Sequence, residues 1–398
     1  MKRFTLENYP LENKTVLVRV DFNVPLKEGR VLDNSKIQAS LTTLKFLLDK
    51  NCKIVLMTHL GDPKGKVVLN LKTDPLAKEL QQLLPKAKIQ KLDDCIGKEI
   101  KEAIKNAKPK QIFLLENLRF YKEEEANDLM FAQSLASLAE VYIDDAFAVS
   151  HRNHASVASV AKFLPAISGH LMEQEIFHLN QAFSNSHPSV WMMGGAKLDK
   201  IDLIKQALKR ADRLLIGGAL AFTFLKSRGI NVGMSKVDTN ALPLAKDILK
   251  KHWRKIVLPV DFVVTEEFKM HAKTSVVGYN QIKNNQIALD IGPKTREGFE
   301  HYLSQAKIIV WNGPLGYMEW SQFAQGTKEI GRFLGQVDCV KIAGGGETSE
   351  AIHKFHLEHN FTHVSTGGGA SLDFLSGKKM PGIDALQESY RRLKGKVK

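Results

Sequence analysis

The stretch Val340–Ala351 reads VKIAGGGETSEA, and it indicates how this chain folds. A short apolar run ends at three consecutive glycines, Gly344 to Gly346, and a helix-forming segment with Glu347 follows. This pattern predicts a strand, a turn and a helix. Glycines let a turn approach a ligand closely, and the first turn of a helix offers unpaired N–H groups and the positive end of its dipole. Such a turn suits a phosphate, although a plain strand-to-helix turn has the same pattern.

Glycine turns of this kind recur after other apolar runs in the second half of the chain. They lie at Trp191–Lys197, Leu215–Leu220, Ile309–Gly316 and Val364–Ser371. In an open parallel sheet the carboxyl ends of the strands share one edge, and ligands bind in the crevice beyond it. The second half is therefore predicted to hold a phosphorylated ligand.

Strand and helix patterns also alternate in the first half. The predicted strands are Lys14–Val20, Lys53–Thr58, Gln111–Leu115 and Glu140–Ile143, and the predicted helices are Ser35–Lys50, Asp74–Leu84, Gly97–Asn106 and Glu124–Ala139. This alternation indicates an α/β fold with parallel sheets and crossover helices. We place a first domain at residues 1–167, an interdomain helix at 168–186, a second domain at 187–382 and a final helix at 383–398, which we expect to return to the first domain.

Polar residues follow the predicted strands of the first half. They are Asp21, Asn23, His59, Arg119 and Arg152. If the sheet is parallel, these side chains converge, and two arginines with a histidine make a site for a small anion, because a guanidinium matches carboxylate and phosphate oxygens. Each residue alone has a simpler explanation as a turn former, a satisfied histidine or a surface ion-pair partner.

The charge of the chain favours anionic partners. The 57 Lys and Arg residues exceed the 43 Asp and Glu residues, which leaves +14 at pH 7. The basic residues are spread out, and we identify the tail, Arg391 to Lys398, as the only dense run and interpret it as a solvated helix end. No zinc-ligand spacing or basic, aromatic-interleaved stretch is recognised, so a nucleic-acid-binding protein is a minor alternative.

The remaining composition is that of an ordinary globular protein. The three cysteines, Cys52, Cys95 and Cys339, are too few and too distant for a disulfide framework. The N-terminus is too polar for a signal peptide, and no apolar run is long enough to cross a membrane. We therefore expect a cytoplasmic protein.

Several motifs occur in a fixed order along almost the whole chain. They are VRVDFNVPL, THLGDP, ENLRF, DAFAVSHR, GGAK, LPVDFVV, DIGPKT, VWNGPLG, GGGE and STGGGASLDFL. Their order and approximate spacing resemble one family, phosphoglycerate kinase. The resemblance implies two Rossmann-like domains joined by an interdomain helix and a hinge. It also implies reversible phosphoryl transfer from 1,3-bisphosphoglycerate to Mg·ADP, giving 3-phosphoglycerate and ATP in glycolysis and gluconeogenesis.

The resemblance further implies roles for individual residues. The phosphoglycerate ligands would be Asp21, Asn23, Lys36, His59, Asp62, Arg119 and Arg152. The nucleotide ligands would be Lys200, Glu319, Gly344, Gly345, Gly346, Glu347 and Thr348, with Glu347 also at the Mg²⁺ cofactor. The transferring phosphoryl group would be stabilised by Lys36, Lys197, Lys200 and amides near Gly367–Gly369. Asp290, Gly292 and Pro293 are interpreted as structural. The implied partners are small-molecule substrates, with no specific nucleic acid, no membrane and a monomeric chain.

Four departures from the family pattern bear on catalysis. Lys36 stands where the family has its catalytic arginine, Asp62 replaces another arginine, Glu347 replaces an aspartate, and the segment GGAKLDK is one residue short. A lysine keeps the charge but loses the two-pronged fork of arginine. Two interpretations stay open: an active kinase in which lysine does the work of arginine, or a catalytically weak or silent relative that binds nucleotide and serves as a binding protein.

Overall fold

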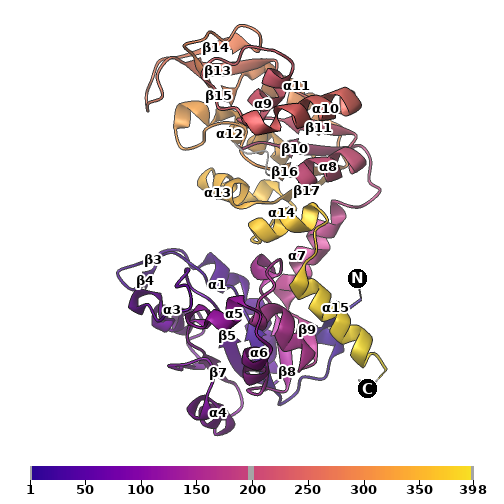
Figure 1. Cartoon of the computed structure of the whole chain (residues 1–398). Helices are drawn as coiled ribbons and strands as arrows, with labels where there is room; N and C mark the ends of the chain where they lie inside the picture. Colours follow the sequence, from indigo (N-terminus) through magenta and orange to yellow (C-terminus); the bar gives the residue numbers. More distant parts are fainter. Residues whose placement is uncertain (1, 196–200, 396–398) are drawn as a thin grey trace. The chain divides into compact units, whose positions relative to one another are not determined.

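The computed structural model describes residues 2–195 and 201–395 (Figure 1). The chain forms two compact units, residues 1–176 with 379–398, and residues 177–378. The units divide within helix α7 (His170–Gln181) and just before α15 (Pro381–Leu393). Ser168, which we predicted to lie in the interdomain helix, instead completes strand β9 (Ala166–Ser168), so α7 begins later than expected.

The first unit is built on a parallel sheet with the order β1-β9-β8-β2-β5-β7-β6. Besides β9, its strands are β1 (Phe4–Thr5), β2 (Thr15–Arg19), β5 (Lys53–Met57), β6 (Lys88–Lys91), β7 (Gln111–Leu114) and β8 (Val141–Asp144). Arg19 at the end of β2 is in register with Met57 of β5 and Asp144 of β8. The carboxyl ends of these strands therefore lie side by side, as the sequence predicts.

The helices of the first unit surround this sheet. They are α1 (Ser35–Ala39), α2 (Leu41–Asp49), α3 (Asp74–Leu83), α4 (Lys98–Lys105), α5 (Lys122–Glu125) and α6 (Leu129–Ala136). The helices predicted at 35–50 and 124–139 are each broken in two. In the second case Asn127 adopts the left-handed conformation, with φ 55°, and the Asp128 carboxylate accepts a hydrogen bond from the Phe131 N–H at 2.8 Å, which starts a new helix.

Helix α15 packs against β9 of the same unit (Figure 1). Arg392, which we expected to be merely solvated, donates hydrogen bonds to the carbonyl oxygens of Ala161, Lys162 and Leu164. This arginine of the basic tail therefore anchors the last helix. None of the helices in the described ranges combines the length and hydropathy that a bilayer crossing requires.

The second unit contains another parallel sheet, with the order β12-β11-β10-β16-β17-β18. Its strands are β10 (Ser189–Met193), β11 (Arg213–Ile216), β12 (Ile256–Val257), β16 (Ile308–Asn312), β17 (Val340–Ala343) and β18 (His363–Val364). Every strand but β12 leads into one of the predicted glycine turns, so these turns lie along one edge. The structure confirms an α/β fold with two parallel-sheet units.

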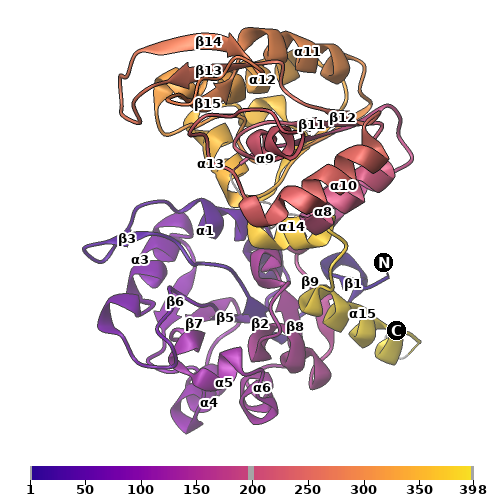
Figure 2. The ribbon, with the colours of Figure 1, turned by 45° about the horizontal axis from the view of Figure 1, so that its top comes forward.

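A small antiparallel sheet of the second unit was not predicted. It has the order β14-β13-β15, with β13 (Asp261–Thr265), β14 (Thr274–Gly278) and β15 (Ile287–Ile291) grouped together in both ribbon views (Figures 1 and 2). The first unit also has a short hairpin of β3 (Leu26–Lys27) and β4 (Arg30–Val31). The helices of the second unit are α8 (Ile201–Arg210), α9 (Leu220–Ser227), α10 (Leu242–His252), α11 (Pro293–Ser304), α12 (Gln325–Phe333), α13 (Gly346–Lys354) and α14 (Gly369–Leu375).

Asp261 joins the small sheet to the start of α11. Its buried carboxylate accepts hydrogen bonds from the backbone N–H groups of Lys294 and Thr295 at 3.0 and 2.8 Å, and from the Thr295 hydroxyl at 2.6 Å. A Cβ on Gly292 would lie 2.3 Å from this carboxyl group, and Pro293 opens the helix. These contacts agree with the structural interpretation of Gly292 and Pro293.

Replacing Asp261 with alanine should destabilise the protein, because the substitution leaves buried helix N–H groups without an acceptor. We expect the free energy of unfolding to fall by about 1–3 kcal/mol. The measurement is urea unfolding followed by circular dichroism. Asp247→Ala is the control, since Asp247 forms only an exposed ion pair with Lys251, and equal losses in the two variants would contradict the capping role.

Candidate functional site

Most of the residues predicted to bind an anion in the first unit gather at the carboxyl edge of its sheet. Asp21 and Asn23 follow β2, His59 follows β5, and Arg119 follows β7. The Asp21 carboxylate lies 3.8 Å from Nδ1 of His59. The Asn23 side-chain oxygen accepts a hydrogen bond from the Gly61 N–H at 2.9 Å, and Arg119 donates to the carbonyl oxygen of Gly61 at 2.7 Å. These contacts bring residues from three strand ends together.

Lys36 belongs to the same cluster. Its ammonium group lies 2.8 Å from the Asp21 carboxylate, which is nearly buried, while the lysine side chain is 35% exposed. The short helix α1 places it there, because the Asp33 carboxylate accepts a hydrogen bond from the Ser35 N–H at the start of that helix. The residue that departs from the family arginine is thus held at the sheet edge and is still open to a ligand.

Asn117 fixes the spacing of two strand ends. This fully buried amide accepts hydrogen bonds from the N–H groups of Leu60 and Arg119, both at 3.1 Å, and donates to the carbonyl oxygens of Leu60 and Leu71 at 2.7 and 3.0 Å. All the hydrogen-bonding positions of its side chain are used. Asn117 therefore holds the segment after β5 against the segment after β7, and with them His59 and Arg119.

His59 is held as a neutral hydrogen-bond donor. Its Nδ1 lies 3.2 Å from Nη2 of Arg19, and because a guanidinium only donates, Nδ1 accepts. Burial, with the positive charges of Arg19 and Arg152, holds the pKa of His59 well below its ordinary value. The ring proton is then on Nε2. His59 can donate to an anion without carrying a charge.

A buried polar network behind this cluster was not predicted. Arg19 donates to the Ser156 hydroxyl at 2.9 Å, and Ser156 donates from its N–H and its hydroxyl to the Glu124 carboxylate at 2.9 and 2.6 Å. Nδ1 of His154 lies 3.8 Å from the same carboxylate. One local signal pointed to this network, an arginine inside the apolar strand VLVRV, but nothing local marked Glu124 or Ser156.

Two predicted phosphoglycerate ligands stand apart from these direct contacts. Arg152 follows β8, and its charge lowers the pKa of His59 and His154, so its guanidinium belongs to the cluster electrostatically. Asp62 is more than half exposed and pairs with Lys64 at 2.5 Å. Lys64 therefore offsets the charge of the aspartate that replaces the family arginine.

A pocket of about 680 Å³ opens at the carboxyl edge of the second sheet. Gly195, Gly218, Pro314 and Glu347, which follow β10, β11, β16 and β17, all contribute to its lining. Glu319, the predicted ribose ligand, also lines it. Four of the five glycine turns and both predicted carboxylates therefore meet in one pocket.

Aromatic side chains that we did not predict form a wall of this pocket. Phe268 lines it together with Tyr317, their ring centroids lie 5.3 Å apart, and Phe268 also contacts Trp320 at 4.6 Å. Phe222 and Lys236 also belong to this unpredicted part of the lining. A flat aromatic wall suits a nucleotide base, and a cation suits its phosphates.

The three-glycine turn has the geometry expected of a phosphate turn. Gly345 has φ 102°, and a Cβ there would lie 2.4 Å from Nδ2 of Asn312, so only glycine fits. Gly346 begins α13 with open space around it. Thr348 is buried, donating to the Gly344 carbonyl oxygen at 3.0 Å and accepting from the Gly313 N–H at 2.7 Å. Its hydroxyl thus supports the turn, and its role as a nucleotide ligand stays a prediction.

The predicted magnesium ligand is consistent with its surroundings. Within the described residues, no group of three or more His, Cys, Asp or Glu side chains makes a metal cage. Mg²⁺ that arrives with a nucleotide needs only one or two carboxylates, because phosphates and water supply the other ligands. Glu347 is exposed in the first turn of α13 and lines the pocket beside Glu350. Lys197 and Lys200 lie outside the described residues, so their roles stay predictions.

Buried Asp290 joins the end of β15 to the start of α12. Its carboxylate accepts hydrogen bonds from the N–H groups of Gly326 and Ile291 at 2.8 and 2.9 Å. Burial raises its pKa to about 7. These contacts agree with a structural role.

Replacing Arg152 with methionine should raise the pKa of both His59 and His154. Burial and the Arg152 charge hold the pKa of His154 at about 4, and loss of that charge removes the electrostatic part. The measurement is an NMR titration of the ring protons. Arg30→Met removes an exposed arginine of β4 as the control. Titration midpoints that stay unchanged in Arg152→Met would place Arg152 outside the cluster.

The same low pKa predicts how stability depends on pH. Between about pH 4 and 6.5 the unfolded chain binds more protons at His154 than the folded chain does. The contribution of His154 to the free energy of unfolding is therefore present above this window and is lost as the pH falls through it. In Arg152→Met the lower limit of this pH window should move upward, because loss of the Arg152 charge raises the pKa of His154 in the folded chain.

Comparison with known proteins identifies the family of this chain. A family model described as "Phosphoglycerate kinase" matches residues 6–378. The chain is 47% identical to the phosphoglycerate kinase of Moorella thermoacetica, with 98% of this chain and 100% of that protein covered, and 47% identical to that of Dictyoglomus turgidum, with 96% and 98% covered. The solved structure of phosphoglycerate kinase from Coxiella burnetii aligns with a TM-score of 0.89 and 34% identity, covering 97% of this chain and 99% of that one. The chain belongs to the phosphoglycerate kinase family.

Proposed function

We propose that this chain transfers a phosphoryl group reversibly between 1,3-bisphosphoglycerate and Mg·ADP, as an ATP-dependent kinase of glycolysis. Membership of the family supports the activity. The observation that carries the assignment of substrates is the cluster of Lys36, neutral His59 and Arg119 at one sheet edge, which suits a small phosphorylated carboxylate. The glycine-lined pocket of the second unit suits the nucleotide.

The reaction needs positioning and charge stabilisation more than acid–base chemistry. The β-phosphate oxygen of ADP is already an anionic nucleophile, so no general base and no covalent enzyme intermediate is required. Mg²⁺ bound with the nucleotide would neutralise phosphate charge, with Glu347 as its protein ligand. Hinge closure, a monomeric state and a cytoplasmic location remain predictions.

Lys36 is the proposed stabiliser of the transferring phosphoryl group. Its ammonium is ordered by Asp21 at 2.8 Å but remains partly exposed, so it can reach an anion at the sheet edge. It offers a point charge in place of a planar fork, which gives less directional stabilisation than arginine. The second interpretation, a silent relative, rests on this substitution together with Asp62 and Glu347.

Replacing Lys36 with alanine should lower kcat by about 100-fold or more, with a much smaller change in KM, because the lost charge acts on the transition state. Lys36→Arg should match or exceed the wild type. The measurement is steady-state formation of ATP from 1,3-bisphosphoglycerate and Mg·ADP. Lys45→Ala, an exposed lysine on α2, is the control and should leave both constants unchanged.

Two results would decide between the interpretations. A wild type that binds both ligands without turnover, while Lys36→Arg is active, would favour the silent relative. A wild-type rate that survives Lys36→Ala would remove Lys36 from the mechanism.

Replacing Asp62 with arginine should tighten 3-phosphoglycerate binding, because it exchanges a negative charge near the anion cluster for a positive one. The site is exposed, so the gain should be no more than about fivefold. The measurement is isothermal titration calorimetry. Asp49→Arg makes the same charge change on α2 as the control. Weaker binding in Asp62→Arg would mean that the Asp62–Lys64 pair itself shapes the site.

A further inference from the structure

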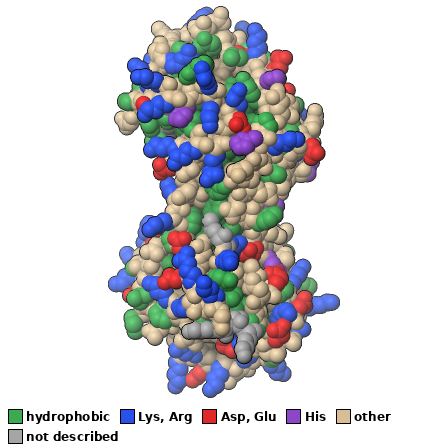
Figure 3. All heavy atoms as spheres, turned by 90° about the vertical axis from the view of Figure 1, so that its right-hand side faces the viewer, with side chains coloured by type: hydrophobic (Ala, Val, Ile, Leu, Met, Phe, Trp, Pro, Cys, Tyr) green, Lys and Arg blue, Asp and Glu red, His purple; other side chains and the backbone are tan. Residues whose placement is uncertain are grey.

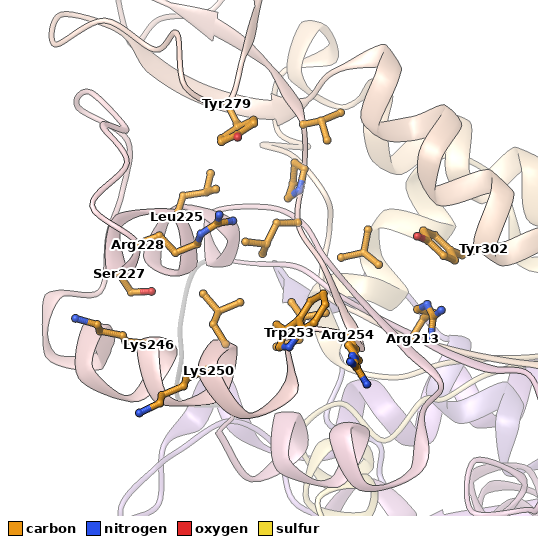
Figure 4. A pocket seen from close by; sticks show the side chains of 16 residues that line it. Arg213, Leu225, Ser227, Arg228, Lys246, Lys250, Trp253, Arg254, Tyr279 and Tyr302 are labelled. Carbon is orange, nitrogen blue, oxygen red and sulfur yellow. The ribbon is translucent and has the colours of Figure 1, made fainter.

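The second unit carries another pocket that the kinase reaction does not use. It has a volume of about 990 Å³ and lies among α10, the end of α9, edge strand β12 and the segment around Tyr279 (Figure 4). The nucleotide pocket touches α9 nearer its start, at Phe222, whereas this pocket touches Leu225 and Ser227. Among the described residues the two pockets have no lining residue in common, so they are separate cavities.

The charged side chains described in the lining of this pocket are all positive. Its lining contains five cations and, within the described residues, no carboxylate; the cations are Arg213, Arg228, Lys246, Lys250 and Arg254. Within the same residues none of these cations forms an ion pair with an Asp or Glu side chain. Figure 3 shows Lys and Arg side chains on the surfaces of both units. In this pocket, five such side chains line a single cavity. Such a pocket attracts an anion with several negative groups.

The cations are spread along the pocket. Figure 4 shows Lys246 and Lys250 at one end, Trp253 and Arg254 in the middle, and Arg213 beside Tyr302 at the other end. The guanidinium of Arg213 lies 5.6 Å from the centre of the Tyr302 ring. An anion with a single charged group would meet only one of these positions. The spacing therefore favours a ligand whose negative charges are repeated along a chain.

Aromatic and apolar groups lie between the charges. The Trp253 side chain is 66% exposed at the end of α10, with the guanidinium of Arg254 5.3 Å from its ring centre. Buried Ile256 and Leu225 contribute to the apolar floor. An exposed indole beside an apolar floor and a cation can stack on a flat ring.

We propose that this pocket binds single-stranded nucleic acid without sequence specificity, with phosphates on the spaced cations and a base stacked on Trp253. A single strand carries both a phosphate charge and a flat base in each nucleotide, which matches a lining that combines cations with the exposed Trp253 ring. A membrane surface is disfavoured because the site is concave. From the sequence we recognised one dense basic run, the tail; the segment 250–255, KKHWRK, is a second one and interleaves an aromatic residue.

The test is fluorescence anisotropy of a labelled oligo(U) of about twelve nucleotides. It uses the full chain at about 50 mM salt. Each measurement is made with the kinase sites empty and again with saturating Mg·ADP and 3-phosphoglycerate. Trp253→Ala should weaken binding at least about fivefold, whereas Trp253→Phe, which keeps an aromatic ring, should retain most of it. Kinase turnover should be unchanged in both variants, which also shows that they fold.

A comparison of two neighbouring lysines tests whether binding depends on this pocket or only on the net positive charge of the protein. Lys250 lines the pocket, whereas its neighbour Lys251 pairs with Asp247 at 2.8 Å and does not. Lys250→Ala should make the slope of log affinity against log salt shallower by about 0.7, the value for one phosphate contact on a single strand, and Lys251→Ala should leave it unchanged. Equal effects of the two lysines, or full affinity in Trp253→Ala, would overturn the proposal. So would loss of binding when the kinase sites are saturated, since the strand would then occupy the nucleotide pocket.

An oligo(dT) of the same length tests whether the pocket distinguishes single-stranded DNA from single-stranded RNA. Similar affinity for both would support recognition by phosphates and stacking alone. Binding of duplex DNA as tightly as oligo(U) would contradict base stacking, because the bases of a duplex are not available to Trp253.

Discussion

Parallel strand pairing is the constraint on which both sites depend. It forces the carboxyl ends of neighbouring strands onto one edge, so groups that are far apart in the sequence meet in space. In the first unit this edge gathers Asp21, His59 and Arg119, and in the second it gathers the glycine turns. One architecture thus gathers two kinds of group that suit a phosphate: charged side chains in the first unit, and backbone amides with a helix start in the second.

Buried polar contacts in the first unit hold the strand-end residues in place and fix the protonation state of His59. Arg19 uses its guanidinium to fix the tautomer of His59, and Asn117 holds the segments after β5 and β7 together. Such groups are costly to bury unless every partner is satisfied, so they also fix the positions of the strand ends. The resulting cluster offers an anion one neutral donor among several cations. Lys36 adds a charge that is ordered by Asp21 and still open to a ligand.

Local patterns predicted much of this, and tertiary context decided the rest. The glycine turns and the strand-end residues were visible because each is a short motif, and parallel pairing then implied their convergence. Glu124 lies in the sequence KEEE, which is typical of an exposed helix, so its complete burial was not predictable. Strand β13 reads like any buried parallel strand, and nothing local showed that it pairs antiparallel with β14. Lys197 and Lys200, which are predicted to stabilise the phosphoryl group, lie outside the described residues.

The central claim is that the chain keeps phosphoryl-transfer chemistry with a lysine in place of the family arginine. The most direct measurement is ³¹P NMR of stoichiometric enzyme with Mg·ATP and 3-phosphoglycerate, which observes the transfer on the protein itself. The account predicts that resonances of ADP and of an acyl phosphate appear beside those of the starting ligands. Bound ATP and 3-phosphoglycerate with no acyl phosphate would contradict it, because the chain would then hold both substrates without joining them.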